Sequence, residues 1–252
     1  GQEYELSNHL PLAVMWPQGI KNPGRTVNDY VSFIDFAPTF LELAGLTAES
    51  AGMAATSGRS LTDIFRSSRA GWVTPSRDHV LIGKERHDIG RPYDWGYPMR
   101  GIVKNDILYL RNYEPTRWPA GNPETGYLNC DGSPTKSVVL GLRGSAETRH
   151  FWESNFGKRP EVEMYHVKND IYCLKNLAEQ PGFARIEAEM DRLMVAELKE
   201  QGDPRMSGQG HIFDEYAYAD RSGASFYRRY VMGEKMRAGW VNETDFESGP
   251  LD

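Results

Sequence analysis

The sequence predicts a fold between the α/β and α+β classes. In this fold the edge of a larger α/β sheet is followed by a smaller antiparallel sheet packed by a long C-terminal helix. Three patterns lead to this prediction. A continuous apolar run precedes a helical pattern near the N-terminus, two alternating runs enclose a short turn in the middle, and one long amphipathic pattern follows.

The first pattern is the run PLAVMW at 11–16, which has a proline at its start and another directly after it. Its length and flanks favour a strand covered on both faces, as in a parallel or mixed sheet. A helix is predicted over 31–46. Asp35 can cap this helix, Pro38 fits its first turn and Gly45 follows its last apolar position. We expect this strand and helix to need packing partners from outside the chain.

The second pattern occupies the middle of the chain. After a polar surface loop at 47–58 and a brief helix at 60–65, the run HVLIG at 79–83 reads as a strand. The segment 99–113 then alternates on both sides of Lys-Asn-Asp at 104–106. This arrangement is typical of a β-hairpin with a short Asn/Asp turn.

The third pattern is the clearest helix, predicted over 181–203, and it follows a predicted strand at 161–167. Residues 114–160 read as irregular, and 204–252 are weakly patterned with one helix near 225–238. The apolar positions of the long helix recur at intervals of three and four: Phe183, Ile186, Met190, Leu193, Met194 and Leu198.

Composition excludes several classes of protein. The 252 residues carry a net charge of -6, which argues against a dedicated nucleic-acid binder. No stretch approaches the roughly 18 consecutive apolar residues of a membrane span. Cys130 and Cys173 belong to no C-x-x-C pair, and we expect both to be ordinary buried thiols.

Candidate binding residues concentrate in RHDIGRPYDWGYPMR, residues 86–100, directly after a predicted strand. Five side chains of this stretch are the predicted substrate-binding residues: His87, Asp88, Arg91, Asp94 and Arg100. The arginines suit bidentate recognition of sulfate, phosphate or carboxylate.

The same stretch contains Tyr93, Trp95 and Tyr97, which could stack on a sugar ring or shield a polar pocket from water. A plainer interpretation is that the charges pair with each other and the rings fill the space under a long loop. The residues alone leave both interpretations open. The sequence contains no phosphate-binding glycine loop, dinucleotide fingerprint, zinc helix or nucleophile elbow.

Several segments together resemble the C-terminal part of a sulfatase of the alkaline-phosphatase superfamily. VSFIDFAPTFLELAGL resembles the family helix V-S-x-x-D-x-x-P-T-x-L-x-x-A-G, and SGRSL matches the G-x-S-L that follows it. VEMYHVKNDIYCLKNLA resembles the family signature E-L-Y-D-L-x-x-D-P-x-E-x-x-N-L-A, with His166 in place of Asp and Cys173 in place of Glu. His87 and Asp88, followed by YPMR, are similar to the heparan N-sulfatase (sulfamidase)-like sulfatases.

The resemblance implies hydrolysis of sulfate esters or N-sulfate on a carbohydrate of the glycosaminoglycan type. It also implies a calcium ion and a formylglycine made from a C/S-x-P/A-x-R motif. Cys130 begins CDGSP and fails that motif. We therefore expect no catalytic or metal-binding residue in this chain, and expect the N-terminal part of the sulfatase to supply both groups.

The resemblance divides the chain into three expected parts. Residues 1–75 would complete the sulfatase catalytic domain, 76–205 would form the sheet and helix subdomain, and 206–252 would be a peripheral tail. The implied location is periplasmic or secreted, or lysosomal in a eukaryote. The expected partners are a sulfated carbohydrate and the N-terminal sulfatase fragment.

In this scheme His87 binds sugar more readily than it acts as a proton donor, because the principal acid of the family belongs to the missing half. Two other functions stay open. The chain could be a non-catalytic sugar-binding or assembly module, or part of a phosphoester or phosphonate hydrolase of the same superfamily.

Overall fold

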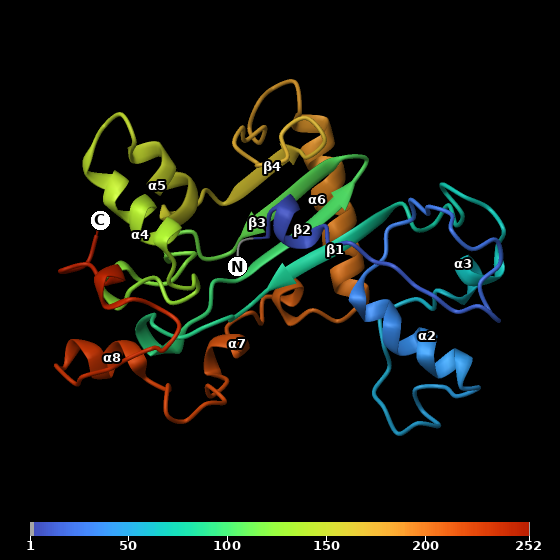
Figure 1. Cartoon of the computed structure of the whole chain (residues 1–252), viewed down its shortest axis with the longest axis horizontal. Coiled ribbons are helices and arrows are strands. Elements are labelled where there is room, and N and C mark those ends of the chain that lie inside the picture. Colours follow the sequence, from blue (N-terminus) through green and yellow to red (C-terminus); the bar gives the residue numbers. More distant parts are fainter. Residues whose placement is uncertain (1–2, 252) are drawn as a thin grey trace.

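The computed structural model describes residues 3–251, and a four-stranded antiparallel sheet lies at its centre (Figure 1). The strands lie side by side in chain order: β1 (His79–Lys84), β2 (Met99–Lys104), β3 (Ile107–Asn112) and β4 (Val162–His166). The sheet and the surrounding helices confirm the predicted mixed fold class. The strands predicted at 79–83 and 161–167 are confirmed.

The predicted hairpin is formed by β2 and β3. Lys104 pairs with Ile107, and the two residues between them make the turn. Asn105 and Asp106 have φ values of 51° and 61°. A two-residue turn with both φ values positive matches the right-handed twist of the strands, and Asn and Asp tolerate this conformation better than most residues.

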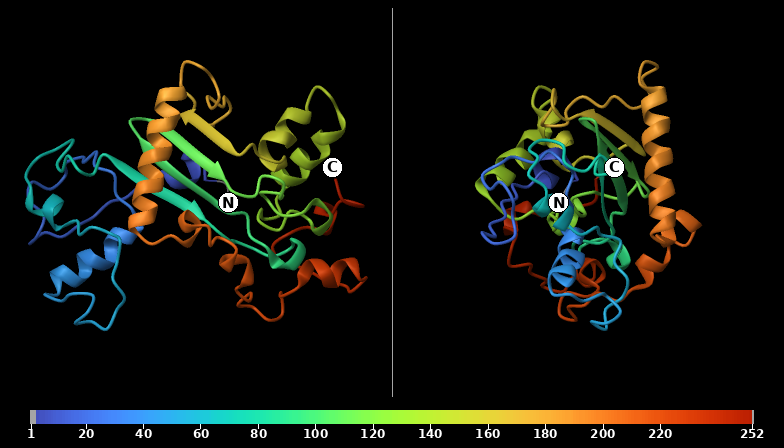
Figure 2. Two further views of the ribbon diagram at one scale, coloured as in Figure 1. Left: turned by 180° about the vertical axis from the view of Figure 1, so that it is seen from behind. Right: turned by 90° about the vertical axis from the view of Figure 1, so that its right-hand side faces the viewer.

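The long helix is α6 (Ala184–Glu200), and it covers one face of the sheet (Figure 2). Met190 and Met194 from the helix pack with Ile102, Tyr109 and Met164 from the strands. The periodic apolar positions of the sequence therefore do face the sheet, and the helix prediction is confirmed with ends a few residues shorter than 181–203.

The opposite face of the sheet carries buried polar groups among its apolar side chains. Glu163 on β4 accepts hydrogen bonds of 2.7 Å from the hydroxyls of Tyr4 and Tyr165 and from the Asn112 amide. Tyr4 lies directly before the short helix α1 (Glu5–Asn8). This carboxylate therefore fastens the N-terminal segment to the sheet.

The strand predicted at 11–16 is wrong for this chain. Within residues 3–251 this segment pairs with no strand, and its apolar side chains are exposed, Met15 to 89%. A strand is stable only when its backbone groups find partners, and the sheet formed by this chain lies elsewhere. The apolar run thus marks a segment suited to burial that this chain leaves uncovered.

The helix predicted over 31–46 is shorter than expected. A 3₁₀ turn, η1 (Phe33–Asp35), leads into α2 (Phe36–Leu43), which ends before Gly45 at φ 71°. Ser32 is the capping residue, and Asp35 completes a capping box by accepting from the Ser32 backbone N–H. The buried Asp35 carboxylate also binds the Arg77 guanidinium at 3.0 Å. The brief helix predicted at 60–65 is α3 (Thr62–Arg66).

Residues 114–160 are more regular than predicted, because they contain α4 (Pro134–Gly141) and α5 (Arg149–Phe156). Ser133 caps α4 by accepting from a backbone N–H in its first turn, and proline occupies the first helical position. The helix predicted near 225–238 is only α8 (Phe226–Val231). A second short helix, α7 (Ile212–Glu215), precedes it.

Both cysteines are free thiols; Cys173 is buried and Cys130 is half-buried. No helix within the described residues is long and apolar enough to cross a membrane.

Candidate functional site

The 86–100 loop connects β1 to β2 and contains one 3₁₀ turn, η2 (Pro92–Asp94), against which α8 packs. Arg86 attaches this loop to the segment before α8. Its guanidinium donates to the carbonyl oxygens of Asp94, Tyr216 and Ala217 at 3.0–3.2 Å. The loop is therefore held in place by residues about 130 positions further along the chain.

Two of the five predicted binding residues reach solvent. His87 is exposed and Asp88 is half-buried. The Asp88 carboxylate accepts from the Ile89 backbone N–H at 2.8 Å. Burial raises the pKa of Asp88, while that hydrogen bond and the positive charges of His87 and Arg91 oppose the rise. The pair thus presents an imidazole beside a carboxylate at the end of β1.

Arg91 and Asp94 are buried and hold the loop from inside. The Arg91 guanidinium donates to the carbonyl oxygens of Trp118 and Pro119 at 2.8 and 3.0 Å. Burial lowers the pKa of Arg91 to about 10. The Asp94 carboxylate accepts from the Ser225 backbone N–H at 2.6 Å. These contacts fix the shape of the loop that carries His87.

Arg100 lies on the other side of β2, the side that α6 covers. Its guanidinium pairs with Asp203 and Glu85, each at 2.5 Å, and Arg205 pairs with the same Glu85 at 2.7 Å. Within the described residues no ion pair joins two of the five predicted residues. His87 and Arg91 lie close enough to Asp88 to influence its carboxylate electrostatically, whereas Arg100 is engaged with Glu85 and Asp203 on the α6 side of β2.

The three rings of the loop take different positions. Tyr97 is buried in the sheet face opposite α6, whereas Tyr93 is 78% exposed and Trp95 is half-buried. Only Tyr93 and Trp95 can therefore contact a ligand from solvent.

The sequence pattern did not single out Lys84. It lies at the end of β1 with its ammonium 5.8 Å from the centre of the Tyr97 ring. Burial, and then the charge of Arg91, lower the pKa of Lys84 to about 8. The sequence did contain an indication of its position, because strand alternation places Val80, Ile82 and Lys84 on the same face of β1.

The side chains of the described residues do not assemble a carboxylate-rich metal site. Among residues 3–251, no group of three or more His, Cys, Asp or Glu side chains is arranged to hold a metal ion. Cys130 does not fit formylglycine either, because Asp131, Gly132, Ser133 and Pro134 follow it. Burial raises the pKa of the Cys130 thiol, which keeps it in the unreactive protonated form.

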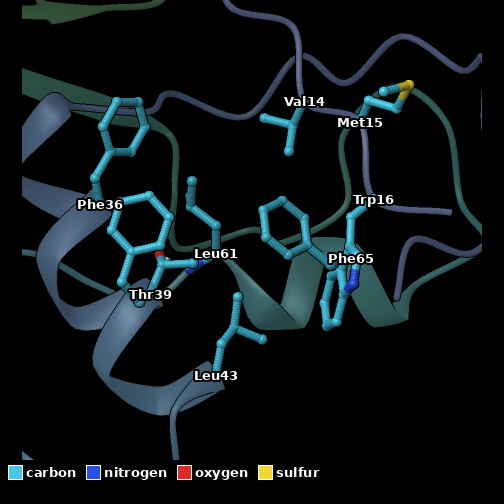
Figure 3. Close-up of a pocket in the computed structure, with 9 residues that line it drawn as sticks. Val14, Met15, Trp16, Phe36, Thr39, Leu43, Leu61 and Phe65 are labelled. Carbon is cyan, nitrogen blue, oxygen red and sulfur yellow. Dashed lines mark hydrogen bonds between the residues drawn. The ribbon is translucent and has the colours of Figure 1, made fainter. Parts of the chain in front are cut away.

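A second feature is an apolar cavity of about 470 Å³ beside α2 and α3 (Figure 3). The cavity lies between the 11–16 segment and these two helices. Its lining consists of Val14, Met15, Trp16, Phe36, Thr39, Phe40, Leu43, Leu61 and Phe65. The lining is almost entirely apolar, so this cavity suits the packing of protein side chains and offers little to a charged sugar.

Comparison with known proteins relates the chain to one family. Residues 2–81 match the family model described as N-sulphoglucosamine sulphohydrolase, C-terminal. An ulvan-active sulfatase of Formosa agariphila is 25% identical over 199 residues, which cover 79% of this chain and 34% of that protein. Human N-sulphoglucosamine sulphohydrolase is 24% identical over 213 residues, covering 81% of this chain and 39% of that protein.

A protein solved in complex with its substrate D-glucosamine-2-N,6-O-disulfate superposes with a TM-score of 0.46 and 18% identity. That superposition covers 75% of this chain and 28% of the solved one. The chain spans about a third of the length of the ulvan-active and human relatives.

Proposed function

We propose that this chain is the C-terminal portion of a sulfatase and that the intact protein hydrolyses sulfate esters or N-sulfate on a carbohydrate of the glycosaminoglycan type. The match of residues 2–81 to the sulphohydrolase C-terminal family is the observation that carries this proposal. Relatives described as an ulvan-active sulfatase and as a sulphohydrolase of N-sulphoglucosamine support a sulfated saccharide as the substrate.

In this proposal the chain binds and orients the sugar, and the preceding part of the protein performs the cleavage. The preceding part would supply the calcium ion and the formylglycine, for which the described residues offer no fitting side chains. The expected division of the chain into 1–75, 76–205 and 206–252 belongs to the same proposal. So does a periplasmic, secreted or lysosomal location.

Among the five candidate residues, His87 and Asp88 would contact the sugar directly. His87 makes no hydrogen bond to another residue in the described range 3–251, so its imidazole is available to a sugar hydroxyl, amino or sulfate group. Asp88 accepts hydrogen bonds and can receive one from a sugar hydroxyl. Arg91 and Asp94 would keep the loop in position, and Arg100 would anchor the start of β2.

The test uses the full-length protein and measures sulfate release from heparan sulfate fragments and from ulvan. We expect the His87→Ala variant to lose about tenfold to a hundredfold in kcat/KM, because one or two hydrogen bonds to a polar or charged group are lost. His150→Ala is the matched control, since His150 is also exposed but lies on α5. It should leave turnover unchanged.

Two results would contradict the proposal. Full-length protein that releases no sulfate from either polysaccharide would favour the sugar-binding or assembly module. Full-length protein that cleaves a phosphate or phosphonate ester in preference to the sulfate ester would place it among the other hydrolases of the superfamily.

A further inference from the structure

The ring of Tyr93 projects into solvent from a backbone held in an unfavourable conformation. Its side chain is 78% exposed, yet its φ and ψ are 57° and 19°. The next residue, Asp94, also has a φ of 57°. Residues with a side chain rarely adopt this left-handed region, and two in succession persist only where surrounding contacts hold them.

Those contacts come from the backbone and from Asp94, and the Tyr93 ring is not needed for them. The Asp94 carboxylate accepts from the Ser225 N–H at 2.6 Å, and the Trp95 N–H donates to the Pro92 carbonyl at 3.1 Å. Arg86 donates to the Asp94 carbonyl at 3.2 Å. The strained turn therefore displays an aromatic ring whose own burial contributes little to stability.

The exposed ring belongs to a preformed stack. The centres of the Tyr93 and Trp95 rings are 4.8 Å apart with 37° between their planes. The Arg117 guanidinium lies 4.6 Å from the centre of the Trp95 ring. Arg117 is fixed by a bidentate pair with Asp214, at 2.8 and 3.1 Å, and by the Gly96 carbonyl at 3.1 Å. The stack is thus oriented before any ligand arrives.

We propose that Tyr93 and Trp95 form a stacking site for a pyranose ring of a sulfated polysaccharide. The site would hold a sugar unit other than the one whose sulfate is removed. This inference rests on the proposed function and deepens it.

Three properties of the stack suit this ligand. The C–H face of a pyranose packs against an aromatic ring, while the tyrosine hydroxyl can bond to a ring substituent. A ring with few rotatable bonds, already fixed in place, loses little entropy on binding. The Arg117 guanidinium, neutralised by Asp214, packs against the Trp95 ring and keeps that ring in position.

The decisive variant is Tyr93→Gly in the full-length protein. Glycine adopts a φ of 57° readily, so this change removes the ring while relieving backbone strain. We expect the Kd for heparan sulfate or for ulvan, measured by calorimetry, to rise about threefold to tenfold. The Tm should stay equal or rise.

Two matched variants accompany it. Tyr93→Phe keeps the ring and should bind the polysaccharide nearly as tightly as the original protein. Tyr172→Ala removes another exposed ring, in the loop after β4, and should have no effect. The inference is overturned if Tyr93→Gly binds as tightly as the original, if Tyr172→Ala weakens binding equally, or if the original protein binds neither polysaccharide.

The binding measurement separates this inference from the proposed function. Protein that binds polysaccharide through Tyr93 but releases no sulfate would support the stacking site and contradict the sulfatase proposal. Protein that releases sulfate, with equal polysaccharide affinity in the original and in Tyr93→Gly, would contradict the stacking site alone.

Discussion

The long helix α6 and the N-terminal helix α2 both have amphipathic sequences, but their apolar sides differ in how far they are buried. Met194 on α6 is 0% exposed, whereas Phe40 on α2 is 68% exposed. Both residues occupy positions that an amphipathic pattern assigns to a core-facing side. The difference shows that such a pattern indicates a need for burial, and that the partner surface decides whether burial occurs.

The N-terminal region buries a small cluster around Leu61 and Phe65, but within the described residues the outer side of α2 and the 11–16 segment find no partner surface. Its apolar cavity opens between the 11–16 segment, α2 and α3 (Figure 3). The chain spans about a third of the length of its long relatives. In the proposed function, the preceding part of the sulfatase packs against this apolar surface and buries it.

The first prediction compares one substitution in each region and has the largest expected effect. Met194→Ala should lower the free energy of unfolding by about 2–5 kcal/mol, because it leaves a cavity in the packed face of the sheet. Phe40→Ala should change it by less than about 0.5 kcal/mol in this chain, because an exposed ring loses little on truncation. Urea unfolding of both variants gives the comparison. Equal losses would mean that the N-terminal region is as well packed as the sheet.

A second prediction concerns the uncovered region. Met15→Asp should leave the stability of this chain unchanged and weaken its association with the separately expressed preceding part by at least about tenfold. A buried unpaired carboxylate at an apolar contact is costly. Association is measured by calorimetry, with Met232→Asp as the control because Met232 is exposed at the far end of the molecule, after α8. Equal association of Met15→Asp and the original chain would show that this segment stays uncovered.

A third prediction concerns the sheet face opposite α6, where Lys84 is partly buried. Burial lowers the pKa of Lys84 from 10.5 to about 8. Between these values the unfolded chain binds the proton that the folded chain has released, so stability should rise with pH across this window. Below pH 8 the cost of holding the buried ammonium is fully present.

The full shift corresponds to roughly 3 kcal/mol, and the partial exposure of Lys84 should make the observed rise smaller. The measurement is the difference in unfolding free energy between the original chain and Lys84→Met at pH 7 and pH 9.5, because the subtraction removes the contribution of the tyrosines. A difference that does not change with pH would show that Lys84 is solvated as an ordinary lysine.

The local elements of this protein were predictable from its sequence. The hairpin turn at Asn105 and Asp106, the strands on both sides of it and the long helix all depend on neighbouring residues. Turn conformation and the two periodicities are properties of a short stretch of chain. The sulfatase-like motifs are equally local, and the order of residues is enough to identify them.

Which charged residues of the 86–100 loop face solvent was decided only by the tertiary structure. Arg91 and Arg100 look alike in sequence, yet one binds the backbone carbonyls of Trp118 and Pro119 and the other binds Asp203, just after α6. Their partners lie 27 and 103 residues away. The exposure of the 11–16 segment was likewise decided by the tertiary structure, because no distant segment within residues 3–251 packs over it. A side chain's type shows what it can bind, but burial and pairing depend on distant segments that folding brings beside it.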